Sequence, residues 1–231
     1  NTVREYLLQH YPQADPARLR VIPRGIDPHA FAPAPMPDTA ARARIAQHYP
    51  QLAGNGPLLL LPGRGTRLKG HADAIALLAQ LRAGGVDACL WMPGARQSER
   101  ADYVRELEQL AQAADVADAL AISAPTDAMR DAYAACDLVL QLSRKPEAFG
   151  RTVLEALAVG RPVLGWDHGG VGELLHQLFP QGAVPAFQIS ELTQRARRLM
   201  AQPPALPVTM PYTLHAMQEA TLALYQDIIG A

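Results

Sequence analysis

Residues 138–155 read LVLQLSRKPEAFGRTVLE and contain a complete strand, loop and helix pattern. A short apolar run comes first, Pro146 and Gly150 interrupt it, and a helix is expected to begin near Arg151 or Thr152. An apolar run with no polar alternation is typical of a strand in a parallel sheet whose two faces are covered by helices. The stretch therefore predicts one unit of an α/β fold.

The same pattern repeats outward from this stretch in both directions, with short apolar runs alternating with segments of helical spacing. We expect strands at residues 19–22, 57–61, 88–92, 119–122, 138–142 and 162–166. The helices between them are expected at residues 69–81, 98–114, 128–135 and 152–159. Right-handed crossovers then predict a doubly wound, Rossmann-like parallel sheet, with its ligand site beyond the carboxyl ends of the strands.

Two segments with four prolines each, residues 27–37 and 203–211, are typical of connectors. We therefore expect three parts: an initial segment at 1–18, a Rossmann-like domain at 19–202, and a connector with a C-terminal helix at 203–231. Because the sequence starts at Asn1 without an initiator Met, we also expect it to be a fragment of a longer protein.

The composition narrows the classes of function. The 231 residues carry 21 Lys and Arg against 22 Asp and Glu, a net charge of −1, so we expect no nucleic-acid partner and no polybasic membrane surface. Cys89 and Cys136 lack the paired spacing of a zinc or redox site, which predicts reduced thiols in a cytoplasmic protein. The apolar runs are too short to cross a bilayer, and no signal-peptide pattern is present.

The loop after the second expected strand, residues 63–70, reads GRGTRLKG and combines three cations with three glycines. Backbone N–H groups at a helix N-terminus favour an anion, and Gly63 permits its close approach. The fork of Arg64 and the mobile charge of Lys69 together suit a diphosphate. The order of a P-loop is absent, and composition alone fits a solvated basic turn equally well.

The loop after residues 138–142 is a second candidate anion site. Free N–H groups from Phe149 to Thr152 are expected to face the cleft at the start of the helix. Glu147 lies before that helix and Glu155 lies one turn inside it. Two carboxylates around an anion-binding turn suit a ligand with sugar hydroxyls on both sides of a phosphate, although Glu155 could simply complement the helix N-terminus.

A third, glycine-rich loop at residues 165–173 is expected to shape the mouth of the same crevice. We do not assign a catalytic role to His168, because loop histidines are more often solvated groups. The zinc-protease and nucleophile-elbow motifs are absent, so the metal-hydrolase and α/β-hydrolase classes lack their basic parts.

Together these loops resemble the C-terminal, donor-binding domain of retaining glycosyltransferases with the GT-B fold, most closely family 4. Residues 146–163, PEAFGRTVLEALAVGRPV, resemble the E-x7-E motif and the A-x-G-x-P-V strand that follows it. Gly63-Arg64 with Lys69-Gly70 is similar to the G-R…K-G loop. The opening motif V-I-x-N-G-V-D…F resembles residues 21–31, and the D-x-G-G-x-x-E loop resembles residues 167–173.

The resemblance implies a role for each matching residue. Arg64, Lys69 and Glu147 would be the catalytic residues, the first two neutralising the donor diphosphate and the third holding hydroxyls of the transferred sugar. Glu155 would hold the ribose hydroxyls. The other donor contacts would come from Gly63, from the backbone of Phe149, Gly150, Arg151 and Thr152, and from Ile122 and Ala124 beside the nucleobase.

The resemblance also implies a reaction and its partners. A hexosyl unit would pass from a UDP-, GDP- or ADP-sugar to a glycan or lipid-linked acceptor with retention, and no metal cofactor would be required. Residues 1–18 would adjoin a missing N-terminal acceptor domain, and this fragment alone would be inactive. The workplace would be the cytoplasm, with peripheral association at the inner membrane face in cell-envelope or lipopolysaccharide biosynthesis.

Two other functions fit parts of this pattern. A non-catalytic, nucleotide-binding Rossmann-like module would keep the Arg64 and Lys69 anion site but would not need Glu147. Half of a non-hydrolysing UDP-sugar epimerase would share the GT-B layout, although the E-x7-E and G-R…K-G motifs match family 4 better.

Overall fold

The computed structural model describes residues 2–207 and 209–230, and it contains a six-stranded sheet in which all paired strands are parallel. The strand order is β3-β2-β1-β4-β5-β6. The strands are β1 Leu58–Leu60, β2 Cys89–Pro93, β3 Leu120–Ser123, β4 Leu138–Gln141, β5 Val163–Trp166 and β6 Ala183–Val184. This arrangement confirms the predicted doubly wound, Rossmann-like α/β class.

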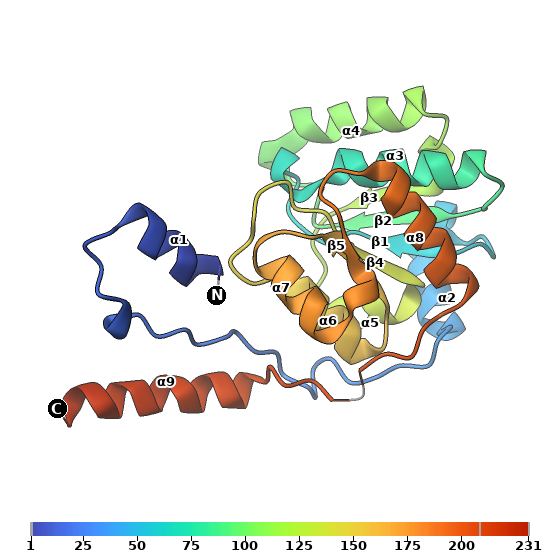
Figure 1. Ribbon diagram of the computed structural model, residues 1–231. Helices are drawn as coiled ribbons and strands as arrows, with labels where there is room; N and C mark the ends of the chain where they lie inside the picture. The colour runs from blue at the N-terminus through green and yellow to red at the C-terminus, as the bar shows by residue number, and fades with distance from the viewer. Residues whose placement is uncertain (1, 208, 231) are drawn as a thin grey trace.

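Helices cover both faces of the sheet (Figure 1). On one face α3 packs against α4 and α8; on the other α5 packs against α2 and α6, and α6 against α7. The helices are α1 Thr2–His10, α2 Thr39–His48, α3 His71–Ala83, α4 Ala101–Ala113, α5 Met129–Ala135, α6 Arg151–Val159, α7 Gly169–Leu178, α8 Ile189–Ala201 and α9 Leu214–Ile229.

The central strands form the core because their side chains are covered on both faces. Leu58, Leu59 and Leu60 of β1 are completely buried, and every residue of β4 is buried as well. Burial of this kind stabilises a strand by roughly 1.5–3 kcal/mol for each large aliphatic side chain. The continuous apolar runs of the sequence therefore correspond to strands buried on both sides.

One predicted strand is absent from the sheet, and one observed strand was not predicted. Residues 19–22 form no strand; they run outside the sheet, where Val21 remains 48% exposed. The sixth strand is instead the two-residue β6, which pairs with β5 and offers too short an apolar run to be recognised. The expected loop at residues 165–173 is also shorter than predicted, because β5 extends to Trp166 and α7 begins at Gly169.

The first proline-rich connector is held on the body by a buried arginine. Arg161 is fully buried and donates hydrogen bonds to the carbonyl oxygens of Pro35 (2.5 Å) and Ala134 (2.7 Å). Just before this connector, Ile26 makes backbone hydrogen bonds with Tyr212 (3.0 Å) and Leu214 (2.8 Å), which flank the end of the second connector. The two connectors therefore leave the body beside each other.

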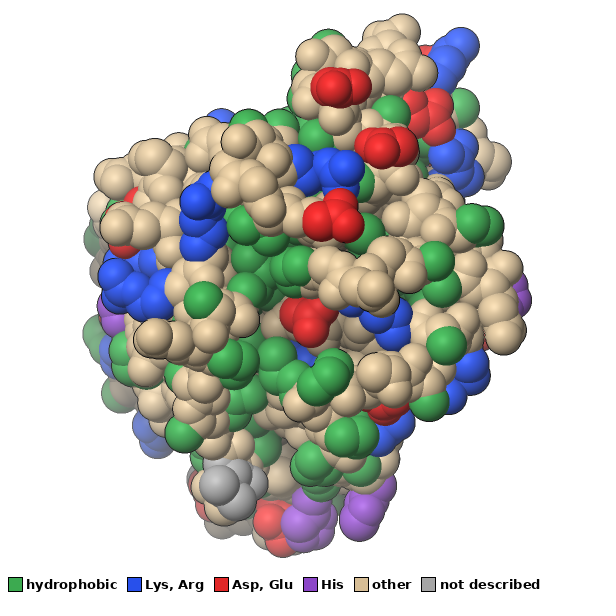
Figure 2. All heavy atoms as spheres, turned by 90° about the vertical axis from the view of Figure 1, so that its right-hand side faces the viewer, with side chains coloured by type: hydrophobic (Ala, Val, Ile, Leu, Met, Phe, Trp, Pro, Cys, Tyr) green, Lys and Arg blue, Asp and Glu red, His purple; other side chains and the backbone are tan. Residues whose placement is uncertain are grey.

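The terminal helices lie at the periphery (Figure 1). Helix α9 extends away from the sheet and, like α1, has no buried residue. Among the described residues, no helix has the length and apolar character needed to cross a membrane. On the side of α2 and α8, acidic and basic side chains are interspersed around an apolar hollow (Figure 2).

Candidate functional site

The candidate site lies where the strand order of the sheet reverses, between β1 and β4. From β1 the chain moves outward to β2 and β3, and from β4 it moves the opposite way to β5 and β6. Strands β1 and β4 are neighbours, with Leu59 opposite Leu138 and Leu60 opposite Val139. The crevice beyond their carboxyl ends is the position at which doubly wound sheets bind ligands. It is bordered by the loop at residues 63–70 and by the loop that joins β4 to α6, at residues 142–150.

An ion pair joins the two loops across this crevice. The Lys69 ammonium lies 2.5 Å from Glu147 Oε1, although the two residues are 78 positions apart. The loops approach closely at Gly70, where a side-chain Cβ would lie 2.0 Å from the Leu142 carbonyl oxygen. Gly70 also has a positive φ of 76°, so glycine is needed there for both conformation and space.

Glu147 is the centre of a hydrogen-bond network. Its Oε1 accepts from Lys69 and from the Ser143 hydroxyl, and its Oε2 accepts from Gln141 Nε2 at 3.1 Å. Burial by itself would raise the pKa of Glu147, but the hydrogen bonds from Lys69 and Ser143 and the Lys69 charge outweigh it and hold the pKa below its ordinary value. Glu147 is therefore an ionised, oriented acceptor.

Helix α6 begins at this crevice with unpaired backbone donors. Its N-cap is Gly150, with a φ of 107°, and no side chain caps the helix. Within the described residues, the N–H groups of Phe149, Gly150, Arg151 and Thr152 find no acceptor. Such a helix start combines free donors with the positive end of the helix dipole and can bind an anion.

Glu155 lies one turn into α6 and is held separately from Glu147. It is only 9% exposed, and its two oxygens accept hydrogen bonds from Arg151 and Tyr133, each at 2.8 Å. Two lone-pair positions of the carboxylate remain after these bonds. The arrangement leaves acceptor capacity for ligand hydroxyls.

The other predicted residues occupy neighbouring loops. Arg64 is exposed, and its side chain makes no hydrogen bond or ion pair with any residue that the structure describes, so the guanidinium is available. Gly63 lies against the Lys69 side chain, whose Cδ is 3.6 Å from the position of a Cβ. Ile122 and Ala124 are farther along the sheet edge, where their carbonyl oxygens accept from Arg96 Nε (3.0 Å) and Gly94 N–H (3.2 Å).

The residues that support Glu147 and Glu155 were missed from the sequence. Gln141, Ser143 and Tyr133 are buried, and their polar atoms point to the two carboxylates. Gln141 and Ser143 come at the end of an apolar run, on either side of Leu142. Because a buried polar group is nearly always hydrogen-bonded, this pattern could have predicted that both side chains support a polar site. Tyr133 gave no such signal, because a tyrosine in a helix is expected to be part of the core.

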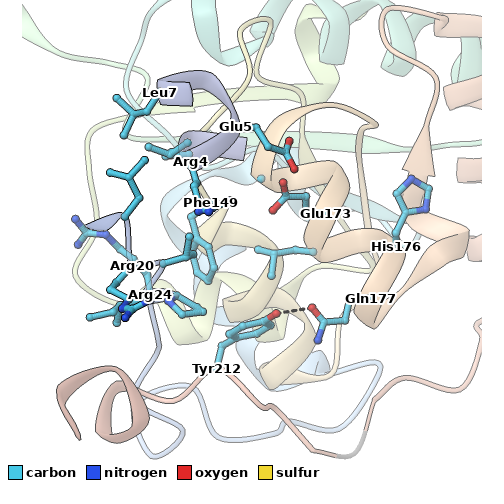
Figure 3. Close-up of a pocket in the computed structure, with 18 residues that line it drawn as sticks. Arg4, Glu5, Leu7, Arg20, Arg24, Phe149, Glu173, His176, Gln177 and Tyr212 are labelled. Carbon is cyan, nitrogen blue, oxygen red and sulfur yellow. Dashed lines mark hydrogen bonds between the residues drawn. The ribbon is translucent and has the colours of Figure 1, made fainter. Parts of the chain in front are cut away.

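A separate cavity of about 770 Å³ adjoins the site beside Phe149 (Figure 3). It lies between α1, the extended residues 19–24 and α7, and the Phe149 ring contacts Tyr212 edge-on in it, with a centroid distance of 5.7 Å. Tyr212 in turn donates a hydrogen bond to Gln177. Lys69, Glu147 and Glu155 do not line this cavity. The crevice that holds these three side chains is therefore separate from it.

Three comparisons relate this chain to known proteins. The family model described as "Glycosyl transferases group 1" matches residues 46–212. The D-inositol 3-phosphate glycosyltransferase of Xylanimonas cellulosilytica is 34% identical over 160 residues, which cover 68% of this chain and 37% of that protein. The chain therefore spans less than half the length of this curated relative.

Two solved structures share the fold. A glycosyltransferase from Rickettsia africae ESF-5 superposes with a TM-score of 0.82 at 22% identity, over 99% of this chain and 62% of that one. The Anabaena protein HepE, solved in complex with UDP and glucose, superposes with a TM-score of 0.73 at 22% identity, over 96% of this chain and 56% of that one.

Proposed function

The chain belongs to the glycosyl transferases group 1 family, and from this premise we propose that it is the nucleotide-sugar-binding domain of a retaining glycosyltransferase of family 4. The observation that carries the proposal is the Lys69–Glu147 pair beside the uncapped start of α6, at the switch point of the sheet. A cation, free N–H groups and an oriented carboxylate in one crevice match a diphosphate linked to a sugar.

Each candidate residue has a place in this proposal. Arg64, Lys69 and the N–H groups of residues 149–152 neutralise the diphosphate, and Glu147 accepts from hydroxyls of the transferred hexose. Glu155 accepts from the ribose, and the nucleobase lies near Ile122 and Ala124. The donor is a UDP-, GDP- or ADP-sugar, and the UDP and glucose in the HepE structure support the first of these.

Catalysis in this proposal comes from charge stabilisation. As the glycosidic bond breaks, negative charge grows on the leaving diphosphate, and Arg64, Lys69 and the start of α6 stabilise it there. The departing diphosphate helps to deprotonate the acceptor, so no protein nucleophile and no metal ion is required. The acceptor is a glycan or a lipid-linked sugar, in cell-envelope or lipopolysaccharide biosynthesis.

We propose that a second, acceptor-binding domain completes the enzyme and that this chain alone binds donor without transferring it. In support, α1 and α9 bury none of their residues against the body. Their exposed apolar side chains include Tyr6 at 55%, Leu222 at 61% and Ile228 at 64%. These surfaces would face the acceptor domain, and the complete enzyme would work in the cytoplasm, peripherally at the inner membrane face.

Calorimetric titration of the chain with UDP, GDP, ADP and their sugar conjugates tests the donor site. We expect one nucleotide to bind, and the double variant Arg64→Ala/Lys69→Ala to lose that binding. Arg67→Ala is the matched control, because Arg67 belongs to the same loop but pairs with Glu106 and lies over the Tyr103 ring. Absence of binding by every nucleotide, or equal losses in the control, would contradict the proposal.

A further inference from the structure

Tyr133 of α5 contacts the carboxylate of Glu155, one of the candidate ligand-binding groups. Its ring is 1% exposed, and its hydroxyl donates a hydrogen bond of 2.8 Å to Glu155 Oε2. The other oxygen, Oε1, accepts from Arg151 at 2.8 Å. The carboxylate of Glu155 is therefore held at both oxygens, which fixes its plane and leaves one acceptor position on each oxygen.

The Tyr133 hydroxyl remains a donor under all ordinary conditions. Burial raises the pKa of Tyr133 well above its ordinary value, and the negative charge of Glu155 and its hydrogen bond raise it further. A phenol that keeps its proton next to a buried carboxylate can satisfy that carboxylate permanently. The contact is thus a fixed support rather than a group that titrates.

The packing around Tyr133 includes Phe31, a residue to which the proposed donor site assigns no role. Phe31 contacts the Tyr133 ring edge-on, with a centroid distance of 6.1 Å. The same connector is held on α5 by Arg130, which donates to the carbonyl oxygens of Ala32 (3.3 Å) and Pro33 (3.2 Å). The connector therefore closes over the ring and limits its movement.

We propose that Tyr133 is a positioning residue that aims the Glu155 carboxylate at the ribose and so sets the preference for a ribonucleotide donor over a deoxyribonucleotide donor. This inference rests on the proposed donor site. A site built to accept hydrogen bonds from a hydroxyl rejects the analogue that lacks it, because its buried acceptor is then unpaired. The rejection is strongest when the acceptor cannot turn away, and Tyr133 with Arg151 prevents that rotation.

The test compares nucleotides that differ only in a ribose hydroxyl. The dissociation constants of UDP, GDP and ADP, and of their 2′-deoxy and 3′-deoxy forms, are measured by calorimetry with the full chain. The variants are Tyr133→Phe, Glu155→Ala and the double variant. Tyr103→Phe is the matched control, because this buried ring has no hydrogen bond from its hydroxyl within the described part of the chain.

We expect Tyr133→Phe to reduce the ribose preference by about tenfold or more, the effect of one hydrogen bond to a charged group. Tyr103→Phe should leave the preference unchanged, and Tyr133→Phe should have no further effect in the Glu155→Ala background. A merely structural role would lower the thermal midpoint and weaken both nucleotide forms equally, without changing their ratio.

The outcomes separate this inference from the proposed function. If Glu155→Ala abolishes the preference and Tyr133→Phe behaves like Tyr103→Phe, the positioning role is overturned while the donor site stands. Nucleotide binding without any ribose preference overturns the roles of Glu155 and Tyr133 together. If no nucleotide binds to the unaltered chain, the proposed function fails, and the role of Tyr133 fails with it.

Discussion

Replacing Glu147 by Gln should change the binding of a nucleotide and of its sugar conjugate in opposite directions. In the structure Glu147 already holds Lys69 at 2.5 Å, so a diphosphate must draw the ammonium away from the carboxylate or share it. The carboxylate also repels an incoming diphosphate. Glu147→Gln removes both the ion pair with Lys69 and the repulsion, which favours the bare nucleotide. The same change removes the charged acceptor proposed for the sugar hydroxyls, which disfavours the sugar conjugate.

The exposure of the pair sets the size of these effects. The Lys69 and Glu147 side chains are 30% and 25% exposed, so the pair is partly solvated and contributes about 0.5–1 kcal/mol. Its loss should tighten the binding of the bare nucleotide by about two- to fivefold. A hydrogen bond to a charged group contributes about 1.5–3 kcal/mol, so the preference for the sugar conjugate should fall by about tenfold or more.

The assay is calorimetric titration of the unaltered chain and of Glu147→Gln with a nucleoside diphosphate and its hexose conjugate. Lys69→Met is measured alongside, and it should weaken both ligands by about tenfold. The matched control is Glu106→Gln, which neutralises the partner of Arg67 outside the crevice. Equal weakening of both ligands by Glu147→Gln would show that Glu147 neither competes for Lys69 nor recognises the sugar.

Three other perturbations have definite expected results. Arg64→Ala should leave the thermal midpoint unchanged, since the Arg64 side chain has no partner among the described residues. It should nevertheless weaken nucleotide binding by about tenfold in calorimetry, and a large drop in the midpoint would contradict this. Burial lowers the pKa of His71 to about 4, although its hydrogen bond with the Thr66 carbonyl oxygen opposes the shift. As the pH falls from 6.5 toward 4, the His71 imidazole therefore takes up a proton in the unfolded chain but not in the folded one. Urea titrations should therefore show about 3 kcal/mol lost between pH 6.5 and 4, and His71→Leu should flatten that slope; an unchanged slope would refute the assignment. Gly70→Ala should lower the free energy of unfolding by more than about 2 kcal/mol, because the new Cβ meets the Leu142 carbonyl oxygen at a positive φ, and a neutral result in the same titration would contradict the loop geometry.

The strand and helix around the second loop were predictable to within about one residue. The sequence indicated a strand at 138–142 and a helix at 152–159, and the structure has them at Leu138–Gln141 and Arg151–Val159. Pro146 and Gly150 mark the interruption, and the apolar run is long enough to bury on both faces. The crossover rules also placed both charged loops at one edge of the sheet, where Lys69 and Glu147 are found together.

Features that depend on long-range packing could not be predicted. Residues 19–22 have the apolar character of a strand, but they find no neighbour in the sheet, whereas Ala183–Val184 pairs with β5 despite its length. Whether a short apolar run forms a strand depends on a neighbouring strand, and local β-propensity does not determine where that neighbour lies. The sequence likewise identified Lys69 and Glu147 as separate ligand groups, and nothing in it indicated that they would bind each other.

The pairing of Lys69 with Glu147 also bears on how the proposed anion site would work in a chain with a net charge of −1. Two unpaired cations in one loop, Arg64 and Lys69, would repel each other. Pairing one of them with a carboxylate removes that repulsion while Arg64 stays available to attract an anion. A diphosphate bound at Arg64 would then compete with Glu147 for the Lys69 ammonium. As Lys69 moves to the diphosphate, Glu147 would become available to accept a hydrogen bond from a sugar hydroxyl. The two halves of a nucleotide sugar would therefore favour each other's binding through one ion pair, although they contact different loops.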